Sequence, residues 1–496
     1  MHTTSFPPRA VPGLSSAQTD RACGVLIGAA AGDALGAGYE FTFPAPDLVP
    51  AMIGGGLGNF APGEWTDDTD QAMAIARVAA RGLDLRSTEA LDRIGDGFLE
   101  WFARGPADLG IQTAQVLGTA GRSASGAELA AAAQAVHDRT GRSAGNGSLM
   151  RTGPVALAHL HDPVALVEAT GAVSGLTHHD DLAREACAVW CLMIRHAVLH
   201  GEFPTFDDIA PWAPRPDHWR GVLAEAEQTS PGAFTENGWS VGALQAAWSA
   251  IRHTPVPTRD PAEHLVDALG TAIRIGHDTD TVAAIAGALL GARWGMTAVP
   301  VGWRRILHGW PGLDVRDLEQ LAVLTVRGGA AGAYGWPGTA HIDYGPLQYG
   351  PPVLVRHPHD DGVWLAGATA LDDVPDEVDA VVSLCLTGSE QVPPGLEQVT
   401  VRLMDEASPE ANPNLDLVLL DAARAVLALR EEGKGVLLHC VAAHSRTPTV
   451  GILYAMLRGV PHQDAVREVA SALPGANPNA GFRSALARLA TRSPLR

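Results

Sequence analysis

Cysteine is scarce in this sequence, and the few that occur form no pattern. Five cysteines in 496 residues are an odd and scattered set, which argues against a disulfide framework. Long hydrophobic runs are also missing: the longest candidate, residues 281–292, ends at Arg293, short of the roughly 20 residues that a membrane span needs. The N-terminal stretch is polar and proline-rich and lacks the apolar core of a secretory signal. We therefore expect a cytoplasmic protein.

Positive charge is in short supply as well. The 35 Lys and Arg residues face 55 Asp and Glu residues, which gives a net charge of −20 with His neutral. A surface this acidic repels phosphate backbones and anionic lipid, so we expect no broad nucleic-acid binding and no membrane association. Hydrophobic residues make up 46% of the chain, enough to bury sizeable cores. At roughly 150 residues per domain, the length predicts about three domains, or two if one of them is a large helical domain of about twice that size.

The sequence pattern divides the chain into an arm, a helical domain and a connecting segment. Residues 1–17 have the composition of a flexible arm, and residues 18–326 are dominated by Ala-rich and Leu-rich stretches of helical period. Because Ala favours helices and permits their close packing, we predict an all-α domain there. Residues 327–352 are crowded with Gly, Pro and Tyr and have no period, which indicates a linker or a docking strap. The clearest helical stretches are residues 72–83, 128–139, 182–199 and 281–295.

Residues 353–496 alternate between two kinds of pattern. Strands alternating with helices predict an α/β domain with a parallel or mixed sheet covered by helices. The expected strands are 363–367, 379–386, 399–404 and 435–439, and the expected helices are 415–432, 447–459 and 461–492.

Two clusters of Asp and Thr stand directly before apolar helices, WTDDTD at 65–70 and GHDTDT at 276–281. A helix cap needs one side-chain oxygen, and each cluster supplies more carboxylates than that. Bringing four carboxylates together without a cation is unfavourable, whereas Mg²⁺ or Mn²⁺ takes oxygen ligands and relieves the repulsion. The pattern alone leaves two interpretations open, a two-cation site or two independent caps.

These clusters belong to an ordered set of motifs that resembles a known family. The set is similar to the signature of the ADP-ribosylglycohydrolases, the helical two-magnesium family that includes the dinitrogenase-reductase-activating glycohydrolases. The resemblance extends over roughly residues 20–326 and comprises residues 23–41, 65–73, 145–151, 177–187 and 276–292.

The resemblance implies a function and a set of site residues. A binuclear Mg²⁺ centre, with Mn²⁺ as the alternative, is expected to promote hydrolysis of the glycosidic bond at ribose C1 through an oxocarbenium-like transition state, releasing ADP-ribose from a modified protein or other molecule. Glu40 is implied as the catalytic glutamate beside the metals, and His178 as a residue near the adenosine. The implied metal ligands are Thr66, Asp67, Asp68, Asp278, Asp280 and Thr281. The implied phosphate-binding loop consists of Gly145, Asn146, Gly147 and Ser148.

A second motif, GVLLHCVAAHSRTPTVG at 435–451, has the pattern strand, loop, helix. Loop N–H groups and a helix N-terminus that converge on one point bind anions, and the same positive end favours the thiolate of Cys440. Arg446 can bind two phosphoryl oxygens. The alternative interpretation is a buried cysteine after a strand, with the arginine on the surface.

This segment resembles the Cys-based protein tyrosine and dual-specificity phosphatases over roughly residues 350–496. The resemblance implies Cys440 as the nucleophile, Arg446 as the phosphate binder, Thr447 as the hydroxyl that assists thiolate departure and His439 as a residue that orders the loop. Asp405 is the expected general acid, with Glu406 and Asp416 as alternatives. The family usually has a glycine within the loop, where this chain has Ala442, Ala443 and His444.

The leading expectation is therefore a two-domain enzyme, a glycohydrolase joined to a phosphatase-like domain that acts on a phosphorylated substrate. Their covalent linkage suggests the hypothesis that both process one substrate carrying ADP-ribose and a phosphoester. Two alternatives remain: a protein that binds ADP-ribose and phosphorylated groups with one or both domains inactive, and a binuclear-metal phosphoesterase.

Overall fold

The computed structural model describes residues 13–347, 352–473 and 475–492. The chain forms two compact units, the first made of Met1–Val299 with Ile306–Ala330 and the second of Pro300–Arg305 with Ala331–Arg496. Residues 1–12 of the expected arm, residues 348–351 of the expected linker and residues 474 and 493–496 lie outside the described residues. The domain limits inferred from the sequence remain predictions beside these units.

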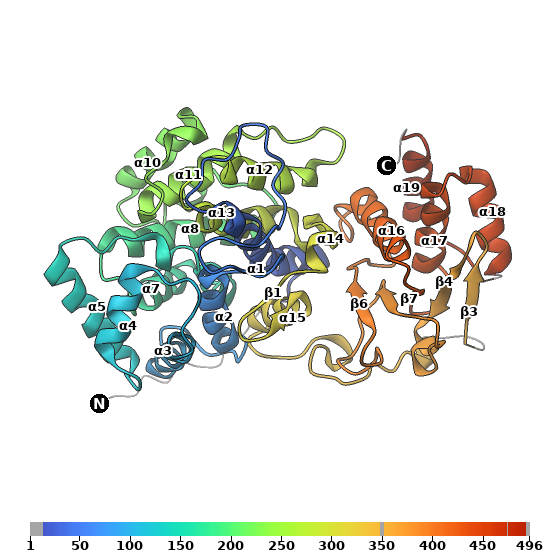
Figure 1. Ribbon diagram of the computed structural model, residues 1–496, viewed down its shortest axis with the longest axis horizontal. Coiled ribbons are helices and arrows are strands. Elements are labelled where there is room, and N and C mark those ends of the chain that lie inside the picture. Colours follow the sequence, from blue (N-terminus) through green and yellow to red (C-terminus); the bar gives the residue numbers. More distant parts are fainter. Residues whose placement is uncertain (1–12, 348–351, 474, 493–496) are drawn as a thin grey trace. The chain divides into compact units, whose positions relative to one another are not determined.

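The first unit is built from helices, as predicted (Figure 1). One exception is a short antiparallel pair, β1 (His308–Gly309) and β2 (Leu313–Asp314). Two short 3₁₀ turns, η1 (Ala37–Tyr39) and η2 (Asn146–Ser148), carry predicted site residues or lie next to them. The helices are α1 (Ser16–Gly36), α2 (Asp67–Ala79), α3 (Thr88–Ala103), α4 (Ile111–Ala120), α5 (Gly126–Thr140), α6 (Gly153–Ala158), α7 (Pro163–Ser174), α8 (Asp181–His200), α9 (Phe206–Ile209), α10 (Pro216–Gln228), α11 (Ser240–His253), α12 (His264–Ile273), α13 (Thr279–Trp294) and α15 (Val315–Val326).

A seam of glycines brings α1 and α13 into backbone contact. A Cβ built on Gly28 would lie 2.4 Å from the carbonyl oxygen of Gly287, closer than any real side chain allows. At the far end of the seam, a Cβ on Gly36 would lie 2.5 Å from Cα of Asp280. The end of α1 therefore meets the beginning of α13, where the second acidic cluster lies. The seam on α1 consists of Gly24, Gly28, Gly32 and Gly36, four residues apart and hence on one face.

The apolar character of this seam helix corrects one expectation from the sequence. Ser16–Tyr39, 24 residues with a mean hydropathy of 1.3 in its most apolar window, is long and apolar enough to cross a membrane by length and composition alone. In the folded unit, 83% of that window is buried. The apparent span was overlooked because small residues, rather than long aliphatic ones, make up most of it, and it forms the core of the helical unit.

The second unit contains the mixed sheet that the sequence predicts. Its strand order is β3-β4-β7-β5-β6, with β3 antiparallel to β4 and the remaining neighbours parallel (Figure 1). The strands are β3 (Leu354–His357), β4 (Asp360–Gly367), β5 (Ala380–Ser383), β6 (Glu397–Thr400) and β7 (Val436–Cys440). The helices are α14 (Val301–Arg304), α16 (Leu415–Glu431), α17 (Arg446–Leu457), α18 (His462–Ala472) and α19 (Ala480–Ala490).

The two faces of this sheet are covered differently. One face carries the large core, in which Val382 and Leu438 pack with residues of α16 and α17. On the other face, Trp364 and Leu437 pack with Leu371 of the short turn η8 (Ala368–Asp372). Central strands buried on both faces explain why the sequence shows them as continuous apolar runs.

Several local predictions in this unit differ from the structure. The strand expected at 379–386 ends at Ser383. Strand β3 was not predicted; it is a short edge strand with exposed positions. The strand expected at 399–404 ends at Thr400, and beyond it the Met404 N–H donates to the Asn412 side chain instead of a neighbouring strand. The single helix expected at 461–492 is two, α18 and α19, because the intervening segment carries Pro478, which a helix interior does not accommodate.

Part of the segment expected to be a linker or strap packs on the second unit. The Tyr344 hydroxyl donates to the carbonyl oxygen of Leu386 at 2.8 Å. The side chain of Gln391 pairs with both backbone groups of Ile342 at 3.2 Å. These contacts hold residues 342–344 beside the loop that follows β5.

Candidate active sites

The first candidate site is a cluster of carboxylates where four segments of the helical unit meet. Oxygens of Asp33, Asp68 and Asp280 lie within 4.8 Å of one another, and so do those of Glu40, Asp278 and Asp280. Asp33 comes from α1, Glu40 follows η1, and the aspartates come from the beginnings of α2 and α13. The fold therefore brings both predicted Asp–Thr clusters to one place, with Asp280 shared between the two groups.

Asp33 is a member of this cluster that the sequence interpretation missed. It is fully buried and accepts hydrogen bonds from the backbone N–H groups of Thr66 and Thr69, at 2.9 and 3.0 Å, and from the Thr69 hydroxyl at 2.6 Å. One carboxylate thus fixes the beginning of α2 and borders the acidic centre. The available signal was a lone aspartate inside an Ala-rich and Gly-rich helix, where burial demands a partner.

Thr66 and Thr281, the two threonines predicted as metal ligands, both donate hydrogen bonds to Asp68. The hydroxyls of Thr66 and Thr281 donate to Asp68 Oδ2 at 3.1 and 3.3 Å, across 213 residues in the second case. The other oxygen, Asp68 Oδ1, is buried and has no hydrogen-bond partner within the described part of the chain. Since a buried carboxylate oxygen without a donor is costly, this atom marks a place that fits a cation.

Asp67 and Asp70 lie differently from Asp68. Gln71 donates to Asp67 Oδ2 at 2.8 Å, and Asp67 belongs to neither close carboxylate group. Asp70 accepts the indole N–H groups of Trp65 and Trp101 at 3.0 and 2.9 Å. Asp67 therefore stays at the edge of the centre, while Asp70 is a satisfied core residue.

Burial and mutual repulsion perturb the carboxyls strongly. Burial, followed by the charges of Asp108, Asp278 and Asp67, raises the pKa of Glu40 to about 8. Burial also raises the pKa values of Asp67, Asp68, Asp278 and Asp280 above their ordinary range. Without a counter-charge such a site retains protons, whereas a divalent cation stabilises the ionised forms. An all-oxygen donor set of this kind fits a hard cation such as Mg²⁺ or Mn²⁺.

Asp108 is a second acidic residue that sequence reasoning missed. It lies between α3 and α4, and its charge contributes to the raised pKa values of Glu40 and Asp67. Its own pKa is raised by burial. No motif surrounds it, so the sequence offered no signal, and only the fold shows that it faces the centre.

The predicted phosphate-binding loop lies next to this centre through Asn146. The Asn146 amide donates to Asp278 Oδ2 at 2.7 Å and to the carbonyl oxygen of Asn237 at 2.9 Å. Asn146, expected to bind substrate, is thus hydrogen-bonded to Asp278, an expected metal ligand. The loop packs closely on the core here, since a Cβ on Gly147 would lie 3.3 Å from the ring of His178, a tight contact.

The side chains of His178 and of Ser148, the last loop residue, are buried on the core side of the loop. His178 is buried, and burial followed by the nearby Arg151 charge lowers its pKa to about 3, so that it is neutral. Ser148 is also buried; its oxygen accepts a hydrogen bond from the Ser174 hydroxyl at 2.9 Å and lies 3.4 Å from the sulfur of Cys187. These side chains support the loop from the core side, which leaves its backbone as the part that can approach a ligand.

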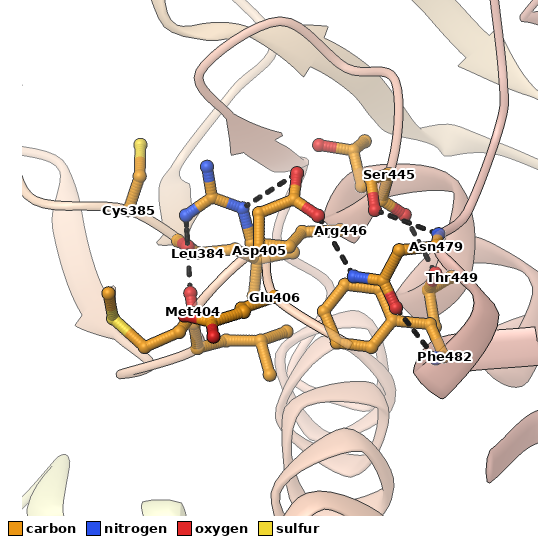
Figure 2. A network of polar contacts seen from close by, with 12 residues as sticks. Leu384, Cys385, Met404, Asp405, Glu406, Ser445, Arg446, Thr449, Asn479 and Phe482 are labelled. Atoms are coloured by element: carbon orange, nitrogen blue, oxygen red, sulfur yellow. Dashed lines mark hydrogen bonds and ion pairs between the residues drawn. The ribbon is translucent and has the colours of Figure 1, made fainter. Parts of the chain in front are cut away.

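The second candidate site is the loop between β7 and α17 (Figure 2). Cys440 ends β7 and Arg446 begins α17. Arg446 Nη1 donates to the carbonyl oxygens of Leu384 and Leu403, at 2.8 and 3.2 Å. Its Nε is buried, has no hydrogen-bond partner among the residues described, and lies 3.8 Å from Asp405 Oδ2. The guanidinium is thus held by one nitrogen and has a donor left for an anion.

The neighbours of Cys440 differ in how well they match their expected roles. His439 is buried and lies 2.8 Å from the Ser383 hydroxyl; burial lowers its pKa to about 4. The Thr447 hydroxyl donates to the carbonyl oxygen of Ala366 at 3.2 Å, which engages the group expected to assist thiolate departure. Ala443, within the stretch where a glycine is usual, has φ +57°. That left-handed conformation is unfavourable for alanine and natural for glycine.

Asp405 is the best placed of the three candidate acids. Asn479 Nδ2 donates to its Oδ1 at 3.0 Å, and its Oδ2 faces Arg446 (Figure 2). Asp416 instead pairs with Arg488 and Arg492 at 2.6 and 3.0 Å. Glu406 is adjacent to Asp405 on the same loop, but Arg446 pairs with Asp405.

The chain is similar to a protein family, to two named hydrolases and to a solved structure. A family model described as ADP-ribosylglycohydrolase matches residues 14–332. The ADP-ribosylarginine hydrolase Tri1 of Pseudomonas putida (strain GB-1) is 30% identical over 288 residues, 57% of this chain and 73% of that protein. The ADP-ribosyl-[dinitrogen reductase] glycohydrolase of Rhodospirillum rubrum is 28% identical over 301 residues, 57% of this chain and 89% of that protein. Among solved structures, human DUSP28 is 27% identical and covers 28% of this chain and 95% of its own, with a TM-score of 0.26.

Proposed function

The chain belongs to the ADP-ribosylglycohydrolase family, and from that premise we propose that its first unit releases ADP-ribose from ADP-ribosylated proteins in a reaction that depends on Mg²⁺ or Mn²⁺. The observation that carries the proposal is that two sets of three acidic residues lie close together and have Asp280 in common. Such a cluster, in which one buried oxygen of Asp68 has no donor among the described residues, is suited to cations.

Each residue of the acidic centre has a role in the proposed reaction. Asp68, Asp278 and Asp280 would hold two cations, with Asp67 and the hydroxyls of Thr66 and Thr281 around them. The bound cations would supply charge that polarises the ribose hydroxyls and a water molecule. Glu40, within 4.8 Å of Asp278 and Asp280, is the group that accepts the proton of the attacking water. Asn146 orients Asp278 by its 2.7 Å hydrogen bond.

The charge near Glu40 supports an arginine acceptor. Asp108 adds a further carboxylate beside Glu40 and Asp67. A guanidinium linked to ribose C1 is cationic, and carboxylates favour a cation. The relative from Pseudomonas putida is named as an ADP-ribosylarginine hydrolase, which agrees with this assignment.

The test is release of free ADP-ribose from a protein ADP-ribosylated on arginine, measured with Mg²⁺, with a chelator, and with the Asp280→Asn variant. The proposal expects release only with the metal and the intact aspartate. Binding without release would favour the binding-protein alternative, and a product cleaved within the pyrophosphate would favour the phosphoesterase alternative. Serine-linked ADP-ribose, tested in parallel, determines whether the acceptor assignment is correct.

A second activity is proposed for the loop at Cys440, Cys-dependent hydrolysis of phosphomonoesters. The supporting observation is the buried Nε of Arg446, which has no hydrogen-bond partner among the described residues and lies 3.8 Å from Asp405 Oδ2. The Cys440 thiolate would attack phosphorus, Asp405 would protonate the departing oxygen, and water would then cleave the thiophosphate. Hydrolysis of an aryl phosphate by the full chain, abolished by Cys440→Ser, tests this activity.

The two activities together suggest one substrate that carries both ADP-ribose and a phosphoester. The full chain, its Asp280→Asn variant and its Cys440→Ser variant can be incubated with the same set of modified proteins. A common substrate accumulates in a half-processed form with each variant. If the two variants leave unrelated substrates unprocessed, the hypothesis of a shared substrate fails.

A further inference from the structure

Asn479, which precedes α19, contacts two parts of the second candidate site, Asp405 and the loop before Arg446, and also caps α19. We propose that Asn479 is a positioning residue that orients Asp405 as the acid and keeps its carboxylate away from the phosphate-binding Arg446. This inference rests on the phosphatase activity proposed above and adds to it a residue that no motif identifies.

The contacts of Asn479 are specific (Figure 2). Its amide nitrogen donates to Asp405 Oδ1 at 3.0 Å. Its amide oxygen accepts the backbone N–H of Phe482 at 3.0 Å, which makes it the cap of α19. Its own backbone N–H donates to the hydroxyl of Ser445, the residue before Arg446, at 3.2 Å. Asparagine is suited to this place because its side chain carries both a donor and an acceptor.

The geometry of the carboxylate shows what the amide achieves. Asp405 Oδ1 is bound to Asn479, while Oδ2 lies 3.8 Å from Arg446 Nε. A direct guanidinium–carboxylate hydrogen bond is shorter, about 2.7–2.9 Å. The carboxylate is therefore paired with Arg446 by charge but held just outside hydrogen-bond distance of its Nε, a buried donor with no hydrogen-bond partner among the described residues. Without the amide, Asp405 would close on Arg446 and occupy the donor that a phosphoryl oxygen needs.

Two functions follow from this one hydrogen bond. Oδ2 remains free to carry the proton that the leaving oxygen receives, and Arg446 Nε remains free for the phosphoryl group. Loss of the amide donor should therefore weaken phosphate binding and proton delivery together, although Asn479 touches neither the phosphate nor the leaving group.

The first variant is Asn479→Ser in the full chain, because serine is also a good helix cap and retains an oxygen for the Phe482 N–H. We expect kcat to fall about tenfold on phenyl phosphate, whose leaving group needs an acid, and much less on 4-nitrophenyl phosphate. The inhibition constant of inorganic phosphate should rise about threefold to tenfold. Asp162→Ser, at the cap of α7 in the first unit, is the matched control for a cap exchange and should change neither quantity.

The decisive variant combines Asn479→Ser with Asp405→Asn. With the carboxylate removed, nothing competes for Arg446, so the inhibition constant of phosphate should return to the wild-type value while phenyl phosphate hydrolysis stays slow. A merely structural loosening of the loop would not be repaired by a second substitution. Phosphate affinity that stays weak in the double variant overturns the proposal, as does a single variant indistinguishable from wild type on both aryl phosphates. A wild-type chain that neither hydrolyses aryl phosphates nor binds phosphate overturns the phosphatase activity itself, and the role of Asn479 with it.

Discussion

In the first unit five carboxylates form two overlapping groups, and buried Asp68 Oδ1 has no donor among the described residues. In the second unit, buried Arg446 Nε has no hydrogen-bond acceptor in the described part of the chain, with Asp405 3.8 Å away. One site has an excess of negative oxygens and the other has an unused positive donor. The sign of the unmet interaction supports the class of ligand proposed for each site, cations for the first and a phosphoryl group for the second.

The carboxyls of the acidic centre and Asp360 of the second unit differ in what surrounds them. Burial raises the pKa of Asp68 and Asp280 in the acidic centre, where like charges surround them. For Asp360 in the second unit, burial acts in the same direction, but hydrogen bonds from Tyr454 and Arg430 lower the pKa to about 2. Hydrogen bonds and a cationic neighbour offset the burial of Asp360, whereas in the acidic centre like charges add to the effect of burial, a pattern typical of functional sites.

The largest expected effect separates the two sites by single substitutions. Asp280→Asn removes the carboxylate shared by both groups, so ADP-ribose release should fall on the order of a thousandfold, while aryl phosphate hydrolysis is unchanged. Cys440→Ser should give the reverse pattern. Both activities are measured on the same preparations. Loss of both activities in either variant would mean that the sites are not independent.

A packing substitution tests how much the glycine seam between α1 and α13 contributes to the stability of the helical unit. Gly28→Val places side-chain atoms against the Gly287 carbonyl, where even a Cβ would lie 2.4 Å away, so the free energy of unfolding of the helical unit should fall by about 3 kcal/mol. Denaturant unfolding followed by helical circular dichroism measures the change. Gly171→Val in α7, where a built Cβ meets nothing within 4 Å, is the control and should cost far less.

The contrast between the carboxylates predicts a pH dependence for the second unit. Because the folded pKa of Asp360 is depressed to about 2, from an unfolded value near 3.9, its stabilising contribution is complete above about pH 4 and is lost as the pH falls toward 2. Unfolding midpoints between pH 5 and pH 2.5 should therefore decline more steeply in the wild type than in Asp360→Asn. Parallel curves for the two proteins would show that Asp360 does not supply this slope.

The smallest expected effect concerns the strained loop. Ala443→Gly relieves a left-handed alanine and should raise the free energy of unfolding of the second unit by about 0.5–1 kcal/mol. Ala442→Gly, at a neighbouring position outside the left-handed region, should lower it instead. Equal effects of the two glycines would argue against strain at Ala443.

How much could be predicted from sequence depends on how local the determinants are. The loop from Cys440 to Arg446 is one continuous segment, so its arrangement between β7 and α17 followed directly from the pattern. The acidic centre combines distant segments, and the sequence located the Asp–Thr clusters at two helix beginnings without showing that they meet. Asp33 was missed, although it lies within the motif at residues 23–41, because only the fold shows that its carboxylate meets the beginning of α2.

Other residues could not be predicted because their roles depend on tertiary contacts. Asp108 and Asn479 lie outside the motifs, and only the fold brings them to Glu40 and Asp405. Local pattern also failed at the end of the strand expected at 399–404, where the backbone of Met404 bonds to the Asn412 side chain instead of a neighbouring strand.

The account depends most on cations held by the shared carboxylates, and calorimetric titration of the full chain with Mn²⁺ tests this directly. The account predicts two ions per chain in the wild type, with thermal stabilisation that rises with Mn²⁺ concentration, and loss of both in Asp280→Asn. Binding of equal stoichiometry and affinity in Asp280→Asn, or no binding in the wild type, would contradict it.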